Sequence, residues 1–118
     1  MVFLDSCIMI DYINGKLNID ETEKKNYYIN SIVDMEVCIG AKHKIELNTI
    51  NKKLSSFISV DIDQQILDLA TDLINKYTLS HNMAIYDAII AATCMIYDLP
   101  LWTYNKKDFR YLQQIKFA

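Results

Sequence analysis

Short apolar runs alternate with longer amphipathic segments along the whole of this 118-residue chain. The runs "VFL", "SFISV" and "LWT" are bounded by polar or turn residues, which predicts buried strands at residues 2–4, 56–60 and 101–103. Two weaker runs, "YYI" at 27–29 and "IKF" at 115–117, are further candidate strands. The apolar pattern therefore predicts up to five short strands.

Helical periodicity is strongest between these runs. Apolar side chains recur at three- and four-residue intervals from Ile66 to Tyr77, which predicts an amphipathic helix. The stretch "MAIYDAIIAATCMIY" at 83–97 is apolar nearly all round, which is typical of a buried helix. We also expect helical structure at 44–54, after a break near Gly40, and a short helix in "NKKDFRYL" at 105–112.

Two more helices have recognisable start signals. After the first strand, Ser6 is a candidate N-cap for a helix that Gly15 ends. Ser31 and Asp34 form an S-x-x-D pattern that predicts a capped helix start. The polar segment 16–26 between these helices is expected to be a loop or a short exposed helix, too short to separate domains.

Strands separated by helices predict an α/β fold with a parallel sheet and helices on both faces. The sequence contains no internal repeat, and we expect residues 1–118 to form a single domain. In open parallel sheets, ligands bind outside the carboxyl ends of the strands. Functional side chains are therefore expected just after the strands.

Composition narrows the class of protein. Apolar residues make up 52% and charged residues 23%, as in globular proteins, and the net charge of −3 argues against holding nucleic acid by bulk electrostatics. Three scattered cysteines form no CxxC pair, so we expect small buried residues in a reducing compartment. The longest apolar stretch has 15 residues and contains Asp87. We expect a cytoplasmic protein that does not enter a membrane.

Four carboxylates occur where their neighbours indicate burial. Asp5 ends the first strand and Asp108 follows the "LWT" strand, so both are expected at the carboxyl edge of the sheet. Glu36 lies on an otherwise apolar helical turn, and Asp87 lies within the most apolar helix, where both could face the same edge. Any one of these acids alone is more readily explained as a helix cap or a salt-bridge partner.

Several carboxylates in one cleft repel each other and resist ionisation, and a divalent cation removes that penalty. A set of oxygen ligands without histidine or cysteine suits Mg²⁺ or Mn²⁺ better than zinc. The four acids together therefore predict a magnesium or manganese site.

Three segments of the chain resemble the signature segments of PIN-domain ribonucleases, the toxins of the VapC type. They are "FLDSCIMIDYI", "SIVDMEVCIGA" and "IYDAIIAATCMIYDLPLWTYNKKDF". The resemblance implies a PIN-like three-layer fold with a central parallel sheet, and a metal-dependent endoribonuclease made as the toxin of a toxin–antitoxin pair. It also implies RNA as the substrate, a cognate antitoxin protein as a partner, and a homodimer.

Carried over by position, the resemblance implies that Asp5, Glu36, Asp87 and Asp108 are the catalytic, metal-binding acids. Ser6 and Thr103 match hydroxyl residues beside the family's site, and Asn105 matches a polar residue there. The segment between Gly15 and Tyr27 departs from the pattern, because it is shorter and more polar than the helical region that helps the family dimerise and bind antitoxin.

RNA must also be bound outside the metal site. Tyr104, Lys106, Lys107 and Arg110 adjoin the Asp108 segment and are candidates to contact the RNA backbone or stack on a base. A solvated helix face explains the lysines equally well. Two other functions stay open: a catalytically inactive PIN-like scaffold that binds RNA or a partner, and, more remotely, a magnesium-dependent phosphoacceptor receiver domain.

Overall fold

A four-stranded sheet lies at the centre of the molecule, and the computed structural model describes all residues from 1 to 118. The strand order is β3-β2-β1-β4, and every neighbouring pair is parallel. The strands are β1 (Val2–Leu4), β2 (Tyr27–Ile29), β3 (Ile58–Ser59) and β4 (Leu101–Trp102). This arrangement confirms the parallel α/β sheet predicted from the alternation of strands and helices.

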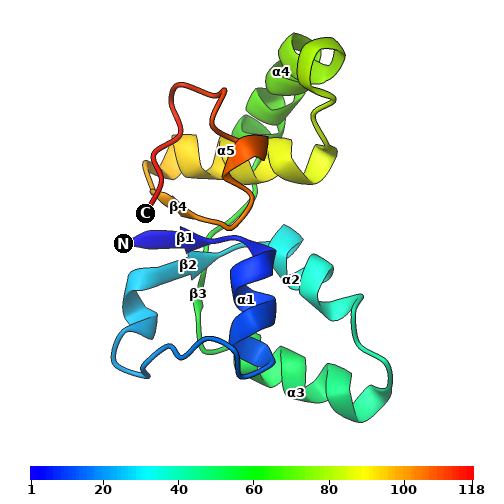
Figure 1. The fold of residues 1–118 in the computed structure, drawn as a ribbon, viewed down its shortest axis with the longest axis vertical. Helices are drawn as coiled ribbons and strands as arrows, with labels where there is room; N and C mark the ends of the chain where they lie inside the picture. The colour runs from blue at the N-terminus through cyan, green and yellow to red at the C-terminus, as the bar shows by residue number, and fades with distance from the viewer.

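Five α-helices flank the sheet in two groups (Figure 1). The first group comprises α1 (Ser6–Ile13), α2 (Ser31–Cys38) and α3 (Lys44–Leu54), and the second comprises α4 (Gln64–His81) and α5 (Ile85–Tyr97). Figure 1 shows the α4–α5 pair on the β4 side of the molecule and the first group on the opposite side. Two single 3₁₀ turns, η1 (Lys24–Asn26) and η2 (Lys106–Asp108), complete the elements.

Strand β1 lies at the centre of the sheet, and the residue that follows it is therefore buried. Phe3 pairs with Tyr28 of β2 on one side and with Leu101 of β4 on the other. Phe3 and Leu4 are completely buried because β1 has a neighbouring strand on both edges and packs under helices on its faces. The residue that follows, Asp5, is thereby carried into the interior at the carboxyl edge of the sheet.

Helix α5 is the most buried helix, as its apolar sequence predicts. Its residues from Ile90 to Cys94 are all buried, and α4 packs along it with an apolar stripe that includes Ile66, Ala70 and Leu73. These side chains belong to one core of 24 buried apolar residues. The start of α5, which carries Asp87, is thereby held rigidly against the sheet.

The predicted helix caps are wrong by one residue at two places. Asp5, not Ser6, is the N-cap of α1, and its side chain accepts a hydrogen bond from the Ser6 N–H. Asn30, not Ser31, caps α2 by accepting from the Val33 N–H. In both cases the extended residue at the strand end makes the cap, because the N-cap needs a non-helical backbone conformation.

The predicted capping box of Ser31 and Asp34 does not form. One carboxylate oxygen of Asp34 is buried without a hydrogen-bond partner, and burial raises the pKa of Asp34.

The C-terminal predictions are only partly confirmed. The helix predicted at 105–112 is reduced to the single turn η2, and Phe109 and Leu112 after it are both buried in the core. The strand predicted at 115–117 is reduced to one parallel bridge between Phe117 and Leu101. The cysteines are free, but only Cys94 is buried, whereas Cys7 and Cys38 are half-buried.

The polar segment 16–26 is mainly a loop, as predicted, and it is anchored by one unexpected side chain. Lys24 is only 6% exposed, and its ammonium group lies over the rings of Tyr12 and Phe57 at 5.2 and 5.5 Å. It also forms a salt bridge of 2.8 Å with Glu21. None of the helices is both long and apolar enough to cross a lipid bilayer.

Candidate metal-dependent nuclease site

The carboxylate of Asp5 is buried at the carboxyl end of β1 and is held by four donors. One oxygen accepts hydrogen bonds from the Ser6 N–H at 2.7 Å and from the Tyr86 hydroxyl at 2.5 Å. The other oxygen accepts from the Thr103 hydroxyl at 2.7 Å and from the Cys7 thiol at 3.8 Å. These contacts explain how a side chain that is 3% exposed can be a carboxylate at the end of a buried strand.

The four donors fix the orientation of Asp5 and limit what else can contact it. An ionised carboxylate offers about four lone-pair positions, two on each oxygen. Each oxygen of Asp5 already accepts two hydrogen bonds, so a cation that binds Asp5 directly must displace a donor. The Cys7 thiol is the weakest of the four, because it is a poor donor and lies 3.8 Å away.

Asp87 is the electrostatic centre of the acidic cluster, which comprises Asp5, Glu36, Asp87 and Asp108. Asp87 lies in the first turn of α5 and is half-buried. Burial raises the pKa of Asp87 from 3.8 to about 6, and the negative charges of Asp108, Asp5 and Glu36 add to the effect. The negative charges of the other three acids selected from the sequence therefore all act on Asp87.

Two of these acids reach the cluster from different elements. Glu36 lies in the second turn of α2, and Asp108 is the last residue of η2. Both are half-buried, and neither forms a salt bridge. Four separate elements, β1, α2, α5 and η2, thus each contribute one acid to the same edge of the sheet.

The donor chemistry of the cluster fits a divalent cation. All four side chains offer oxygen, the ligand that Mg²⁺ and Mn²⁺ prefer. The repulsion that raises the pKa of Asp87 is the energetic cost that a cation would remove. As placed, no three acidic, histidine or cysteine side chains converge tightly enough to hold an ion between them. Magnesium usually keeps several waters and contacts only one or two carboxylates, so this spacing is compatible with it.

The polar residues predicted beside the acids are connected to Asp5 through hydrogen bonds. The Thr103 hydroxyl donates to Asp5 and accepts from the Asn105 N–H at 3.0 Å. Ser6 contacts the cluster through its backbone N–H, which also approaches the Tyr86 hydroxyl at 3.1 Å. Asn105 likewise takes part through its backbone, while its side chain is exposed.

The candidate RNA-binding residues lie on the exposed surface next to η2. Lys106, Lys107 and Arg110 are all exposed. The Lys106 ammonium lies 5.6 Å from the ring of Phe117, and the Tyr104 hydroxyl donates to Asp11 at 3.0 Å. Three cationic side chains therefore lie within two residues of Asp108, and none of them forms a salt bridge with an acid of the cluster.

Sequence reasoning missed two residues of the site, Tyr86 and Cys7. The Tyr86 hydroxyl makes the shortest contact to Asp5, and burial, followed by the charge of Asp5, raises the pKa of this phenol. The pKa of the Cys7 thiol is also raised, chiefly by burial, so the thiol stays protonated as a donor. The only local feature of the sequence that could have suggested a role for Tyr86 is its position directly before Asp87 at the start of a helix.

Comparison with known proteins decides the family. A model of the PIN domain matches residues 2–114 of the chain. The chain belongs to the PIN domain family. This PIN domain is 28% identical over 121 residues to Ribonuclease VapC10 of Mycobacterium tuberculosis, an alignment that covers 98% of this chain and 91% of the relative. It is 30% identical over 115 residues to Ribonuclease VapC1 of Methanocaldococcus jannaschii, covering 96% and 82% respectively.

Solved structures give the same result for the fold. A toxin–antitoxin complex from Klebsiella pneumoniae contains a chain that is 27% identical to this PIN domain, with a TM-score of 0.75, covering 98% of this chain and 95% of that one. The DNA-bound VapBC complex from Salmonella typhimurium has a TM-score of 0.80 at 22% identity, covering 100% and 98%. The PIN-like fold is confirmed, and the receiver-domain alternative is wrong.

Proposed function

We propose that this PIN domain is a metal-dependent endoribonuclease and the toxin component of a toxin–antitoxin pair. The single observation that carries the proposal is the placement of four carboxylates from separate parts of the chain, Asp5, Glu36, Asp87 and Asp108, whose charges act together with burial to raise the pKa of Asp87. The matched relatives named Ribonuclease VapC and the neighbouring toxin–antitoxin complex support the same activity and partner class.

The acids would hold one or two Mg²⁺ or Mn²⁺ ions, with Asp5, Glu36 and Asp87 as principal ligands and Asp108 as the fourth. Such ions lower the pKa of bound water and neutralise charge that develops on phosphate oxygens. The chain's own contribution is positioning, because Tyr86, Thr103 and the Ser6 N–H hold Asp5 in one orientation before any ion binds. The exposed cations Lys106, Lys107 and Arg110 would contact RNA phosphates nearby.

A groove beside the acids supports a protein partner such as an antitoxin. It has a volume of about 250 Å³ and is lined by Ile32, Met35, Ile39 and Tyr86 together with Glu36. Met35 and Ile39 are 57% and 78% exposed and lie side by side in this groove, so together they present an apolar surface to solvent. A chain seated in this groove would cover the approach to Glu36. The short polar segment 16–26 gives no support for antitoxin binding or for the homodimer, which stays a prediction.

The test is RNA cleavage by the purified protein with Mg²⁺ or Mn²⁺ and with EDTA. We expect metal-dependent cleavage by the wild type, and a loss of at least a hundredfold in Asp5→Asn and Asp87→Asn. Asp20→Asn, an exposed acid of the 16–26 loop, is the matched control and should cleave normally. Cleavage that persists in EDTA would refute the metal site. A folded wild type that cleaves no RNA with either metal would favour the inactive-scaffold alternative.

A further inference from the structure

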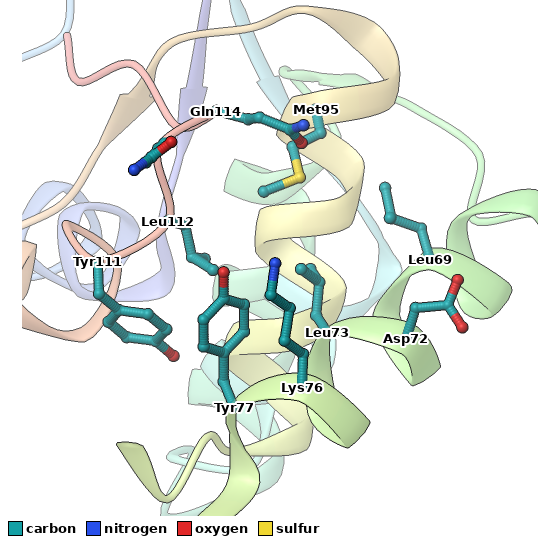
Figure 2. A pocket seen from close by; sticks show the side chains of 10 residues that line it. Leu69, Asp72, Leu73, Lys76, Tyr77, Met95, Tyr111, Leu112 and Gln114 are labelled. Carbon is teal, nitrogen blue, oxygen red and sulfur yellow. The ribbon is translucent and has the colours of Figure 1, made fainter. Parts of the chain in front are cut away.

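A hollow outside the acidic cluster lies between α4, α5 and the C-terminal segment (Figure 2). Its volume is about 400 Å³, within the range of roughly 300–1,000 Å³ that is usual for small-molecule sites. We propose that this hollow, called the tyrosine pocket here, binds one unpaired base of the RNA substrate. The proposal rests on the proposed ribonuclease function and names where that enzyme recognises its substrate.

Aromatic rings form one wall of the tyrosine pocket. Figure 2 shows Tyr77 rising from α4 beside Tyr111 of the C-terminal segment, and their ring centroids are 5.0 Å apart. Outside the pocket, the exposed imidazole of His81 stacks on one face of the Tyr111 ring at 3.9 Å and 12°, which leaves Tyr77 and the other face of Tyr111 to the pocket. Every nucleobase has a flat π-face that stacks on such rings, so this wall suits a base of any identity.

The floor of the tyrosine pocket is apolar and its rim is polar. Leu73 and Met95 lie below, and Leu73 is buried in the core. Asp72 and Lys76 on α4 face Gln113 and Gln114 of the C-terminal segment across the opening, and all four are exposed. An apolar floor with a polar rim suits a small flat ring with polar edges. A protein partner with a flat surface would instead require apolar residues at the rim, and the rim of this pocket is polar.

The rim offers hydrogen-bonding groups that are not used within the protein. Asp72 and Lys76 are a turn apart, yet no salt bridge joins them. The Lys76 ammonium lies 5.4 Å from the centre of the Tyr77 ring, which places a cation directly beside the aromatic wall. Glutamine amides present a donor and an acceptor side by side, the pair that reads the edge of an unpaired base.

The pocket approaches the acidic cluster at its Tyr111 end. Tyr111 follows Asp108 by three residues, and the charges of Asp87 and Asp108 contribute to the raised pKa of the Tyr111 phenol, for which burial is the main cause. RNA whose base enters the tyrosine pocket therefore has its backbone next to the acids that would cleave it.

The experiment measures binding without cleavage, by fluorescence anisotropy of a 5′-labelled, eight-nucleotide single-stranded RNA in EDTA. We expect Tyr77→Leu to raise Kd about tenfold through lost stacking, while Tyr77→Phe, which keeps the ring, binds as the wild type does. Gln114→Ala should raise Kd severalfold. Gln65→Ala, an exposed glutamine elsewhere on α4, is the matched control and should change nothing.

Abasic nucleotides placed one at a time along the RNA give the second measurement. One position should weaken binding to the wild type about tenfold and cause no further loss with Tyr77→Leu. Equal Kd values for Tyr77→Leu and Tyr77→Phe would overturn the proposal. A Tyr77→Leu protein that dissociates from dimer to monomer with unchanged Kd would also overturn it, since the pocket would then be a protein interface.

The same RNA incubated with Mn²⁺ separates this proposal from the proposed function. Cleavage by the wild type together with unaltered binding by all pocket variants would refute the tyrosine pocket alone. Base-dependent binding without cleavage by the wild type would refute the ribonuclease function and leave the pocket as an RNA-binding site.

Discussion

At the scale of single residues, the site depends on how one buried carboxylate is hydrogen-bonded. Asp5 accepts from Tyr86 and Thr103, which lie 81 and 98 residues away in the chain. The acids themselves could be selected from sequence, because a charged residue in an apolar context is a local signal. Tyr86 could not, because nothing near it in the sequence indicates that its hydroxyl meets Asp5.

Tyr86→Phe should reduce both stability and activity. It removes the hydroxyl that donates to Asp5, and hydrogen bonds to charged groups contribute roughly 1.5–3 kcal/mol. We expect the free energy of unfolding in urea to fall by about 2 kcal/mol and cleavage to fall by about tenfold or more, because Asp5 loses part of its orientation. Tyr97→Phe, which loses one exposed hydrogen bond to the Asp61 carbonyl, should change both by little. Equal behaviour of the two variants would contradict this account.

Asp87→Asn should stabilise the metal-free protein at neutral pH. The pKa of Asp87 is raised from 3.8 to about 6, so the folded state binds the proton more tightly than the unfolded state does. The carboxylate therefore lowers stability as pH rises from about 4 to 6, and it costs nothing below about 4. Because Asp87 is only half-buried, we expect a gain on the order of 1 kcal/mol at pH 7, or about 3 °C in Tm.

Thermal melts in EDTA at pH 7 and at pH 3.5 check this prediction. The difference between Asp87→Asn and the wild type should be present at the higher pH and vanish at the lower one. Asp20→Asn removes an exposed acid outside the cluster and should give no gain at either pH. A destabilised Asp87→Asn protein at pH 7 would mean that the carboxylate has a stabilising partner.

At the scale of elements, the strongest predictions came from the longest periodic segments. The apolar stripe of α4 and the all-apolar α5 correspond closely to Gln64–His81 and Ile85–Tyr97. The junctions were harder, because two capping residues stand side by side at both Asp5–Ser6 and Asn30–Ser31, and backbone conformation decides between them. The C-terminal segment was harder still, because the i,i+3 burial of Phe109 and Leu112 fits a helix as well as the single turn η2 that forms there.

Asn30→Ala should destabilise the fold far more than Ser31→Ala. Asn30 is completely buried, caps α2 through the Val33 N–H and donates to the Thr93 hydroxyl of α5 at 3.1 Å. Losing the cap and the link between α2 and α5 should lower the free energy of unfolding by about 2 kcal/mol, as measured in urea. Ser31 is exposed, so its substitution should stay within about 0.5 kcal/mol. A larger loss of unfolding free energy in Ser31→Ala than in Asn30→Ala would show that Ser31 is the N-cap, as the sequence predicted.

At the scale of the whole molecule, charge is distributed unevenly. The net charge is −3, yet Lys106, Lys107 and Arg110 are exposed together beside Asp108. Because the overall charge is negative, we expect RNA recognition to rely on this local set and on non-ionic contacts. Composition predicted weak bulk attraction for nucleic acid, the sequence selected these three cations as candidates, and the structure adds that all three are exposed.

The salt dependence of RNA cleavage should therefore be shallow. Three phosphate contacts predict a slope of about −2 for the logarithm of kcat/KM against the logarithm of salt concentration. Replacing Lys106, Lys107 and Arg110 by alanine together should flatten the slope towards zero. A triple variant at Lys42, Lys44 and Lys52, exposed lysines in and around α3, is the control and should keep the wild-type slope. A slope much steeper than −2 would reveal a larger basic surface.

The long separation between Asp5 and its hydroxyl donors also matters during protein synthesis. Ribosomes add about 5–20 residues per second, so roughly 5–20 s pass between the synthesis of Asp5 and that of Thr103. Until Tyr86, Asp87 and Thr103 have left the exit tunnel, the first acid lacks its hydroxyl donors and the acid at the start of α5. A nascent chain of this PIN domain therefore cannot complete the acidic cluster until the segment up to Asp108 has been synthesised and has emerged.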